Sequence, residues 1–135
     1  MSFISPRARV EGRLEGSNIV LGPTVIGVGS LIGRNVIVGY PARRSLKGFR
    51  FPEPFDIEAF DLVSRGAKIG RNCVLRSGTV VYEAVTVGDG VETGHGVLIR
   101  DGSVVGEGTR IGSSTQLDGT VKVGKNVNVQ SNVYL

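Results

Sequence analysis

The segment from Ile69 to Tyr134 repeats every six residues, and this repeat decides the fold. Cut into sixes it reads IGRNCV, LRSGTV, VYEAVT, VGDGVE, TGHGVL, IRDGSV, VGEGTR, IGSSTQ, LDGTVK, VGKNVN and VQSNVY. The first position is aliphatic in every hexad except the one that opens at Thr93, and the fifth position is always small or β-branched. A short period that continues without a slip is typical of a β-helix.

The period can be converted into geometry, because the fifth position and the next first position lie two residues apart. In an extended strand both side chains point to the same side. Val85 and Val87 would then lie inside, with Thr86 between them outside. The second to fourth positions must turn, and the fourth is mostly Asn or Gly, which tolerate a positive φ. A strand and a corner repeated three times close a triangular coil, and stacked coils pair their strands in parallel.

The frame breaks once, over an insertion from about Tyr40 to Gly66. We therefore expect one domain over residues 1–135, with coils over 1–39 and 67–135 and an inserted loop over 40–66. The loop holds most of the phenylalanines, and its first half is basic whereas its second half is acidic. The segment from Ile57 to Val63 is expected to form one or two helical turns. Such a long loop is either functional or a flap that packs its phenylalanines over an outer face or a neighbouring subunit.

The first coils are less regular than the later ones. Ile4 and Val10 fit one frame, whereas Val20 and Ile26 fit another, which predicts a corner irregularity near Gly16-Ser17-Asn18. Terminal repeats of solenoids are commonly atypical.

The charge is uneven along the chain. Residues 1–50 carry a basic surplus, and the remainder is slightly acidic. A basic half can attract the phosphates of a coenzyme or a nucleotide sugar, although a solvated face is an equally good explanation. The repeat offers no stacking platform or groove-reading helix for nucleic acid. No segment resembles a signal peptide or is long enough to span a bilayer, so we expect a cytoplasmic protein with neither nucleic-acid nor membrane partners.

The repeat resembles the hexapeptide family of acyltransferases, which are left-handed parallel β-helices that work as trimers. Within that family, VGYPARR at 38–44, TGHGVLIRDGSVVGEGTRIG at 93–112 and KVGKNVNVQSNVYL at 122–135 are similar to bacterial and archaeal sugar O- or N-acetyltransferases. The resemblance implies an all-β fold, a single-stranded left-handed parallel β-helix with one long inserted loop. It also implies acetyl-CoA as co-substrate and a sugar or nucleotide sugar as acceptor.

His95 is the only histidine and the residue best suited to chemistry. It occupies the third position of its hexad, which is an outward-facing corner, and an imidazole can take up a proton near neutral pH. The resemblance implies that the histidine of the TGH motif acts as a general base. Gly94 and Gly96 flank it, and their backbone N–H groups are candidates to stabilise a thioester oxyanion. The alternative for His95 is an ordinary corner residue.

Other candidates have weaker support. Glu83 and Asp101 share another column and are candidates to orient the base or bind the acceptor, but solvated turn acids are the better interpretation. Arg43 and Arg44 are candidate phosphate ligands. Cys73 lies at an inward fifth position, where a small core residue is a better interpretation than a nucleophile. No metal is expected, because a zinc site of the kind found in some β-helices needs several histidines.

The resemblance, together with His95, implies acyl transfer from acyl-CoA to a sugar hydroxyl or amine, without a covalent enzyme intermediate. The alternative is a non-catalytic trimeric β-helix scaffold that lacks the C-terminal acyl-CoA-binding coils, since the sequence stops at Leu135 in the middle of a coil. We expect a homotrimer in which the insertion crosses to a neighbour. An open column at the C-terminal end predicts either fraying or docking of two trimers into a hexamer through that end.

Overall fold

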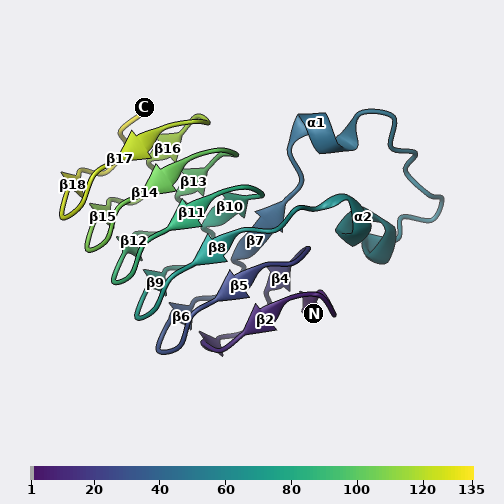
Figure 1. Ribbon diagram of the computed structural model, residues 1–135, viewed down its shortest axis with the longest axis horizontal. Coiled ribbons are helices and arrows are strands. Elements are labelled where there is room, and N and C mark those ends of the chain that lie inside the picture. The colour runs from purple at the N-terminus through teal and green to yellow at the C-terminus, as the bar shows by residue number, and fades with distance from the viewer. Residues whose placement is uncertain (1) are drawn as a thin grey trace.

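The computed structural model describes residues 2–135 as a prism of stacked coils from which one arm projects (Figure 1). The coils form a left-handed parallel β-helix, and within residues 2–135 each of its three faces is one parallel six-stranded sheet. This confirms the expected fold class.

The strands are short and follow one another from sheet to sheet. Sheet A contains β1 (Phe3–Ile4), β4 (Ile19–Val20), β7 (Ile37–Tyr40), β10 (Val80–Tyr82), β13 (Leu98–Ile99) and β16 (Gln116–Leu117). Sheet B contains β2 (Arg9–Val10), β5 (Val25–Ile26), β8 (Lys68–Ile69), β11 (Thr86–Val87), β14 (Val104–Val105) and β17 (Lys122–Val123). Sheet C contains β3 (Arg13–Leu14), β6 (Leu31–Ile32), β9 (Val74–Leu75), β12 (Glu92–Thr93), β15 (Arg110–Ile111) and β18 (Asn128–Val129).

The core is a column of inward side chains stacked one coil above the next. Val87 pairs with Val105 between β11 and β14, and both are buried. Val85 is also buried, whereas Thr86 between the two valines is exposed. The inward and outward positions predicted from the hexads are therefore confirmed.

The corners use the positive φ that the fourth hexad position predicts. Asn72 and Asn126 adopt φ values of 56° and 55°. The same conformation is forced on residues that disfavour it, at Ala84 (57°), Ser114 (63°) and Thr120 (49°). Backbone geometry at the corners is thus set by the stack rather than by each residue's own preference.

The irregularity of the first coil lies elsewhere than predicted. Only Glu11 and Gly12 separate β2 from β3, so this corner is the shortened one. The prediction of a corner irregularity near residues 16–18 is therefore wrong. A Cβ atom at Gly12 would lie 2.7 Å from the backbone oxygen of Ser30 in the next coil. The tight corner therefore requires glycine at this position.

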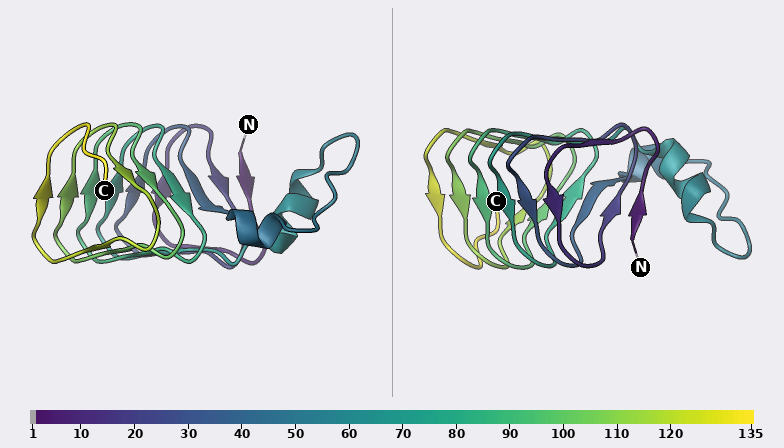
Figure 2. Two further views of the ribbon diagram at one scale, coloured as in Figure 1. Left: turned by 90° about the horizontal axis from the view of Figure 1, so that it is seen from above. Right: turned by 90° about the horizontal axis from the view of Figure 1, so that it is seen from below.

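The arm comprises residues 41–66, because Tyr40 still belongs to β7. It contains α1 (Arg43–Leu46) and α2 (Ile57–Val63), which confirms the helix expected in its second half. The arm leaves the prism at the corner between sheets A and B and extends past the N-terminal coil (Figures 1 and 2). Within residues 2–135 no helix is long and apolar enough to cross a membrane.

Candidate functional site

His95 lies on the corner between β12 and β13, where sheet C turns into sheet A. Its Nδ1 atom is 2.7 Å from the Oγ atom of Ser77, and its backbone N–H donates to the Oγ atom of Ser113 at 2.9 Å. The two serines lie one coil before and one coil after His95 in the same column, as the hexad frame predicts. The His95 side chain is exposed.

Close packing of the coils makes this corner possible only with glycine beside the histidine. A Cβ atom at Gly94 would lie 2.5 Å from the backbone nitrogen of Ser113. Gly96 has a φ of 65°, which glycine adopts without strain. Both glycines are therefore explained by the geometry of the corner.

Two shallow hollows meet at His95. The C-terminal hollow has a volume of about 460 Å³, and the N-terminal hollow about 340 Å³. His95 and Arg76 line both. The C-terminal hollow adds hydroxyl, amide and guanidinium groups, from Arg110, Ser113, Asn128, Gln130 and Ser131. The arrangement gives an exposed imidazole with a polar hollow on its C-terminal side and a mainly apolar hollow, lined in part by Leu31, Val74 and Leu75, on its N-terminal side.

Basic side chains flank the imidazole. Arg34 lines the N-terminal hollow and Arg110 the C-terminal one, and neither forms an ion pair within residues 2–135. Arg76 lies 3.4 Å from Glu92, which offsets its charge. The two unpaired guanidinium groups can bind anionic parts of a ligand on either side of His95. Neither Arg34 nor Arg110 was predicted from the sequence as a site residue.

The glycine N–H groups do not fit the role expected of them. The N–H of Gly94 donates to the backbone oxygen of Ile111 at 2.7 Å, and that of Gly96 donates to the backbone oxygen of Ser77 at 2.9 Å. Both bonds belong to the ladder that joins neighbouring coils. Neither group is free to donate to an oxyanion in this structure.

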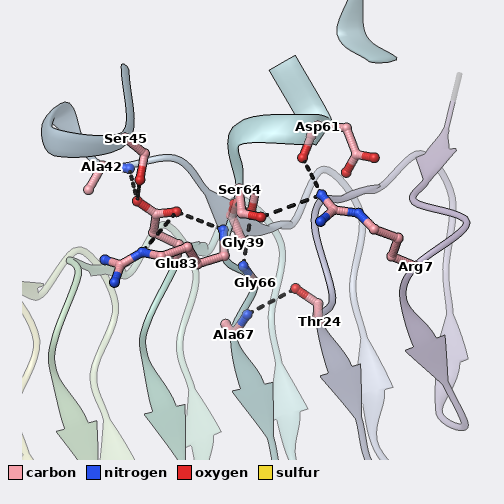
Figure 3. Close-up of polar contacts among 11 residues, drawn as sticks. Arg7, Thr24, Gly39, Ala42, Ser45, Asp61, Ser64, Gly66, Ala67 and Glu83 are labelled. Carbon is pink, nitrogen blue, oxygen red and sulfur yellow. Dashed lines mark hydrogen bonds and ion pairs between the residues drawn. The ribbon is translucent and has the colours of Figure 1, made fainter. Parts of the chain in front are cut away.

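Glu83 is a buried residue, so its description as a solvated turn acid is wrong. Its carboxylate accepts hydrogen bonds from the backbone N–H of Ala42 at 2.9 Å and of Arg65 at 2.8 Å, and from the Oγ atom of Ser45 (Figure 3). The Nε atom of Arg65 lies 3.7 Å away. These donors come from both ends of the arm, so Glu83 fastens the arm to the prism.

The other expected site residues do not meet His95 within one chain. Asp101 and Glu83 follow β13 and β10, on the corner between sheets A and B, whereas His95 is on the corner between sheets C and A. Asp101 pairs with its neighbour Arg100 at 3.7 Å. Arg43 and Arg44 line a separate hollow on the arm with Leu46 and Lys47.

Cys73 is fully buried in the column, which confirms its interpretation as a core residue. Burial raises the pKa of the Cys73 thiol above its ordinary value, because the thiolate loses its hydration. The protonated thiol is a poor nucleophile.

Comparisons with known proteins agree with the repeat. The chain matches the family model for the bacterial transferase hexapeptide (six repeats) over residues 66–101 and that for the hexapeptide repeat of succinyl-transferase over residues 104–135. Among curated proteins no sequence matches. With these repeats stacked into a β-helix, the chain belongs to the hexapeptide-repeat family of transferases.

A solved structure shares the fold. The acetyltransferase domain of PglB from Neisseria gonorrhoeae FA1090 superposes with a TM-score of 0.65 over 98% of this chain, at 16% sequence identity. This chain spans about half of that structure, 51% of its length. At this identity the likeness concerns the fold alone.

Proposed function

We propose that the protein transfers an acetyl or related acyl group from acyl-CoA to a hydroxyl or amine of a sugar or nucleotide sugar. The family supports acyl transfer in general. The observation that carries the proposal is the exposed His95 imidazole, which is bonded at Nδ1 to Ser77 and lies between two hollows, of which the C-terminal one is polar.

His95 can act as a base only if one ring nitrogen keeps a free lone pair. The Nδ1–Oγ distance fits either direction of hydrogen bonding, and we propose the tautomer in which Nδ1–H donates to the Ser77 Oγ, which leaves the lone pair of Nε2 free. Within residues 2–135 no group forms a hydrogen bond with Nε2. Nε2 is thus the atom that would receive the acceptor's proton.

The proposed reaction is a direct displacement. Nε2 of His95 removes a proton from the acceptor oxygen or nitrogen as that atom attacks the thioester carbonyl. The carbon–sulfur bond breaks when the tetrahedral intermediate collapses, and the imidazolium returns the proton to the departing thiolate of coenzyme A. No bond to the enzyme forms, which agrees with the buried Cys73.

The two hollows offer binding groups for both partners of this reaction. Hydroxyl and amide side chains at Ser113, Ser131 and Gln130 match the hydroxyl groups of a sugar, and Arg34 and Arg110 match phosphate. Arg43 and Arg44 line another hollow, so they are not among the phosphate-binding groups proposed at His95. We propose a homotrimer, as the resemblance implies, and a cytoplasmic location, as expected from the sequence.

A non-catalytic trimeric scaffold is the second candidate function. This function is favoured because several residues that were expected in the catalytic site stabilise the fold instead. Glu83 holds the arm, and the N–H groups of Gly94 and Gly96 join coils. On this account the His95 corner would bind no thioester.

Calorimetry with acetyl-CoA, together with detection of released coenzyme A thiol over a panel of amino and hydroxy sugars, separates the two functions. An acyltransferase binds the thioester and releases thiol only when an acceptor is present. Absence of both binding and release over the whole panel would establish the scaffold.

A further inference from the structure

The arm is fixed firmly at its base by buried polar side chains. Glu83 bonds to both of its ends, as described above. Asp61, which is 3% exposed, accepts from the backbone N–H of Gly22 at 2.6 Å and from the Oγ atom of Ser5 at 2.9 Å. Ser64 donates through Oγ to the backbone oxygen of Gly39 at 2.6 Å, which joins the end of the arm to the strand that precedes it (Figure 3). The arm is therefore a built element with a defined direction.

The outer part of the arm presents aromatic side chains to solvent. Phe51 and Phe55 are 61% and 57% exposed. Their rings pack on Phe60 at centroid distances of 6.4 Å and 5.8 Å, and Phe49 packs on Phe51 at 5.0 Å. The cluster reaches back to the prism, since Phe60 packs on Tyr40 of β7 at 5.5 Å, but its exposed rings form an apolar surface of the kind found at contacts.

The charges of the arm are divided between its two limbs. The basic limb, residues 43–50, carries four exposed cations, and the acidic limb, residues 53–58, carries three exposed anions. Within residues 2–135 none of these side chains forms an ion pair, although opposite charges lie in one short segment. The cations are Arg43, Arg44, Lys47 and Arg50, and the anions are Glu53, Asp56 and Glu58.

We propose that the arms of two copies of this chain pair with each other around a twofold axis. A surface with a basic part, an apolar centre and an acidic part is complementary to itself, because a twofold rotation places each basic limb against the partner's acidic limb. The exposed Phe51 and Phe55 then fill the centre of the contact. This inference does not depend on the proposed function.

The direction of the arm decides how the copies meet. It extends past the N-terminal coil rather than lying along a face of the prism (Figure 2). Two copies paired through their arms therefore face each other through their N-terminal ends. Combined with a homotrimer, the twofold contact gives a hexamer of two trimers. The trimers are then joined through their N-terminal ends, whereas the sequence predicted docking through the C-terminal ends.

The acidic limb argues against a lipid surface as the partner. Asp56 directly follows Phe55. Glu53 lies between the two exposed phenylalanines, separated from each by one proline. Anionic headgroups would repel these carboxylates, and inserting the rings would bring the carboxylates to the membrane. A second arm instead offers each carboxylate a guanidinium or ammonium group.

A charge exchange between two variants tests the pairing. The first variant, Arg43→Glu with Arg44→Glu and Lys47→Glu, makes both limbs acidic, and the second, Glu53→Lys with Glu58→Lys, makes both limbs basic. Asp56 is kept because its side chain accepts from the N–H of Glu58 at the start of α2. The control, Lys122→Glu with Lys125→Glu, reverses charges of the same kind on exposed residues of the C-terminal coils.

Sedimentation velocity measures the association of each protein and of a one-to-one mixture of the two arm variants. Each arm variant alone should dissociate to the smaller species, with the dissociation constant raised at least about 10-fold by like charges in contact. The mixture should regain the larger species, because both limb contacts are again between opposite charges. Phe51→Ser should weaken association without any change of charge, and the control should associate as the unmodified protein does.

Three results would overturn the proposal. The first is an unmodified protein that forms no larger species than the first arm variant. The second is a mixture that stays dissociated while both variants keep the melting temperature of the unmodified protein. The third concerns vesicles of phosphatidylglycerol and phosphatidylcholine. If the unmodified protein binds them, the first variant does not and the second binds more tightly, the arm would be assigned to a lipid surface.

Discussion

The regular coils at 67–135 and the arm at 41–66 are stabilised by different interactions. In the coils, every level repeats one apolar column and one ladder of backbone hydrogen bonds, so that Val105 sits between Val87 and Val123 and is 1% exposed. The arm has no repeat, and it is joined to the prism by single polar side chains, Glu83 and Asp61 above all. The stability of the coils is therefore spread over many equivalent interactions, whereas the position of the arm depends on individual residues.

The largest effect should come from a charge placed in the column. Val105 is 1% exposed and its neighbour Val104, on the outer face of β14, is 39% exposed, which makes the two a matched pair. Val105→Asp should lower the free energy of unfolding by about 4 kcal/mol or more, because an unpaired carboxylate is buried. Val104→Asp should change it by less than about 1 kcal/mol.

Urea unfolding followed by far-UV circular dichroism measures both variants. Equal losses at the two positions would show that the column does not dominate the stability of the prism.

Removal of the Glu83 carboxylate should detach the arm from the prism. Glu83→Ala leaves the N–H groups of Ala42 and Arg65 without their acceptor, at a cost of about 2–4 kcal/mol. This cost falls on the arm and not on the coils, so amide hydrogen exchange should rise over residues 41–66 and stay unchanged over 86–135.

Asp101→Ala is the matched control for Glu83→Ala, since Asp101 occupies the same column one coil later but is a partly exposed partner of Arg100. It should alter neither exchange pattern. Increased exchange throughout the coils of Glu83→Ala would show that arm and prism unfold together, contrary to the comparison.

A smaller gain is expected at a strained corner of the coils. Thr120 adopts a φ of 49°, which a β-branched residue disfavours, whereas Asn126 and Asn132 adopt similar values at equivalent corners. Thr120→Asn should raise the free energy of unfolding by about 0.5–1 kcal/mol, because asparagine tolerates the left-handed region. A fall in the urea midpoint would mean that the Thr120 hydroxyl, which donates to the Gly119 oxygen at 2.8 Å, outweighs the strain.

The fold of the coils could be predicted because each hexad carries the same information. The position of Cys73 in the column and the positive φ at Asn72 follow from the frame alone. The shortened corner at Glu11–Gly12 could not be placed, because the first coil is too short to establish a frame on either side of it.

The site could be predicted only where it lies within the frame. The column of Ser77, His95 and Ser113 follows from the hexads, and the structure joins its members by hydrogen bonds. Arg34 was missed because the arm interrupts the count between it and Ser77. The burial of Glu83 was missed because its donors belong to the arm, whose path no periodicity describes.

The most direct test of the proposed chemistry is the rate of acyl transfer in His95→Ala, measured as coenzyme A thiol released with a sugar acceptor that the unmodified protein uses. We expect kcat/KM to fall by about 10²–10⁴-fold, because the group that receives the acceptor's proton is lost. The melting temperature should not change, since the His95 side chain is exposed and its one hydrogen bond is to the Ser77 hydroxyl. An unchanged rate in a folded variant would contradict the assignment of His95 as the base.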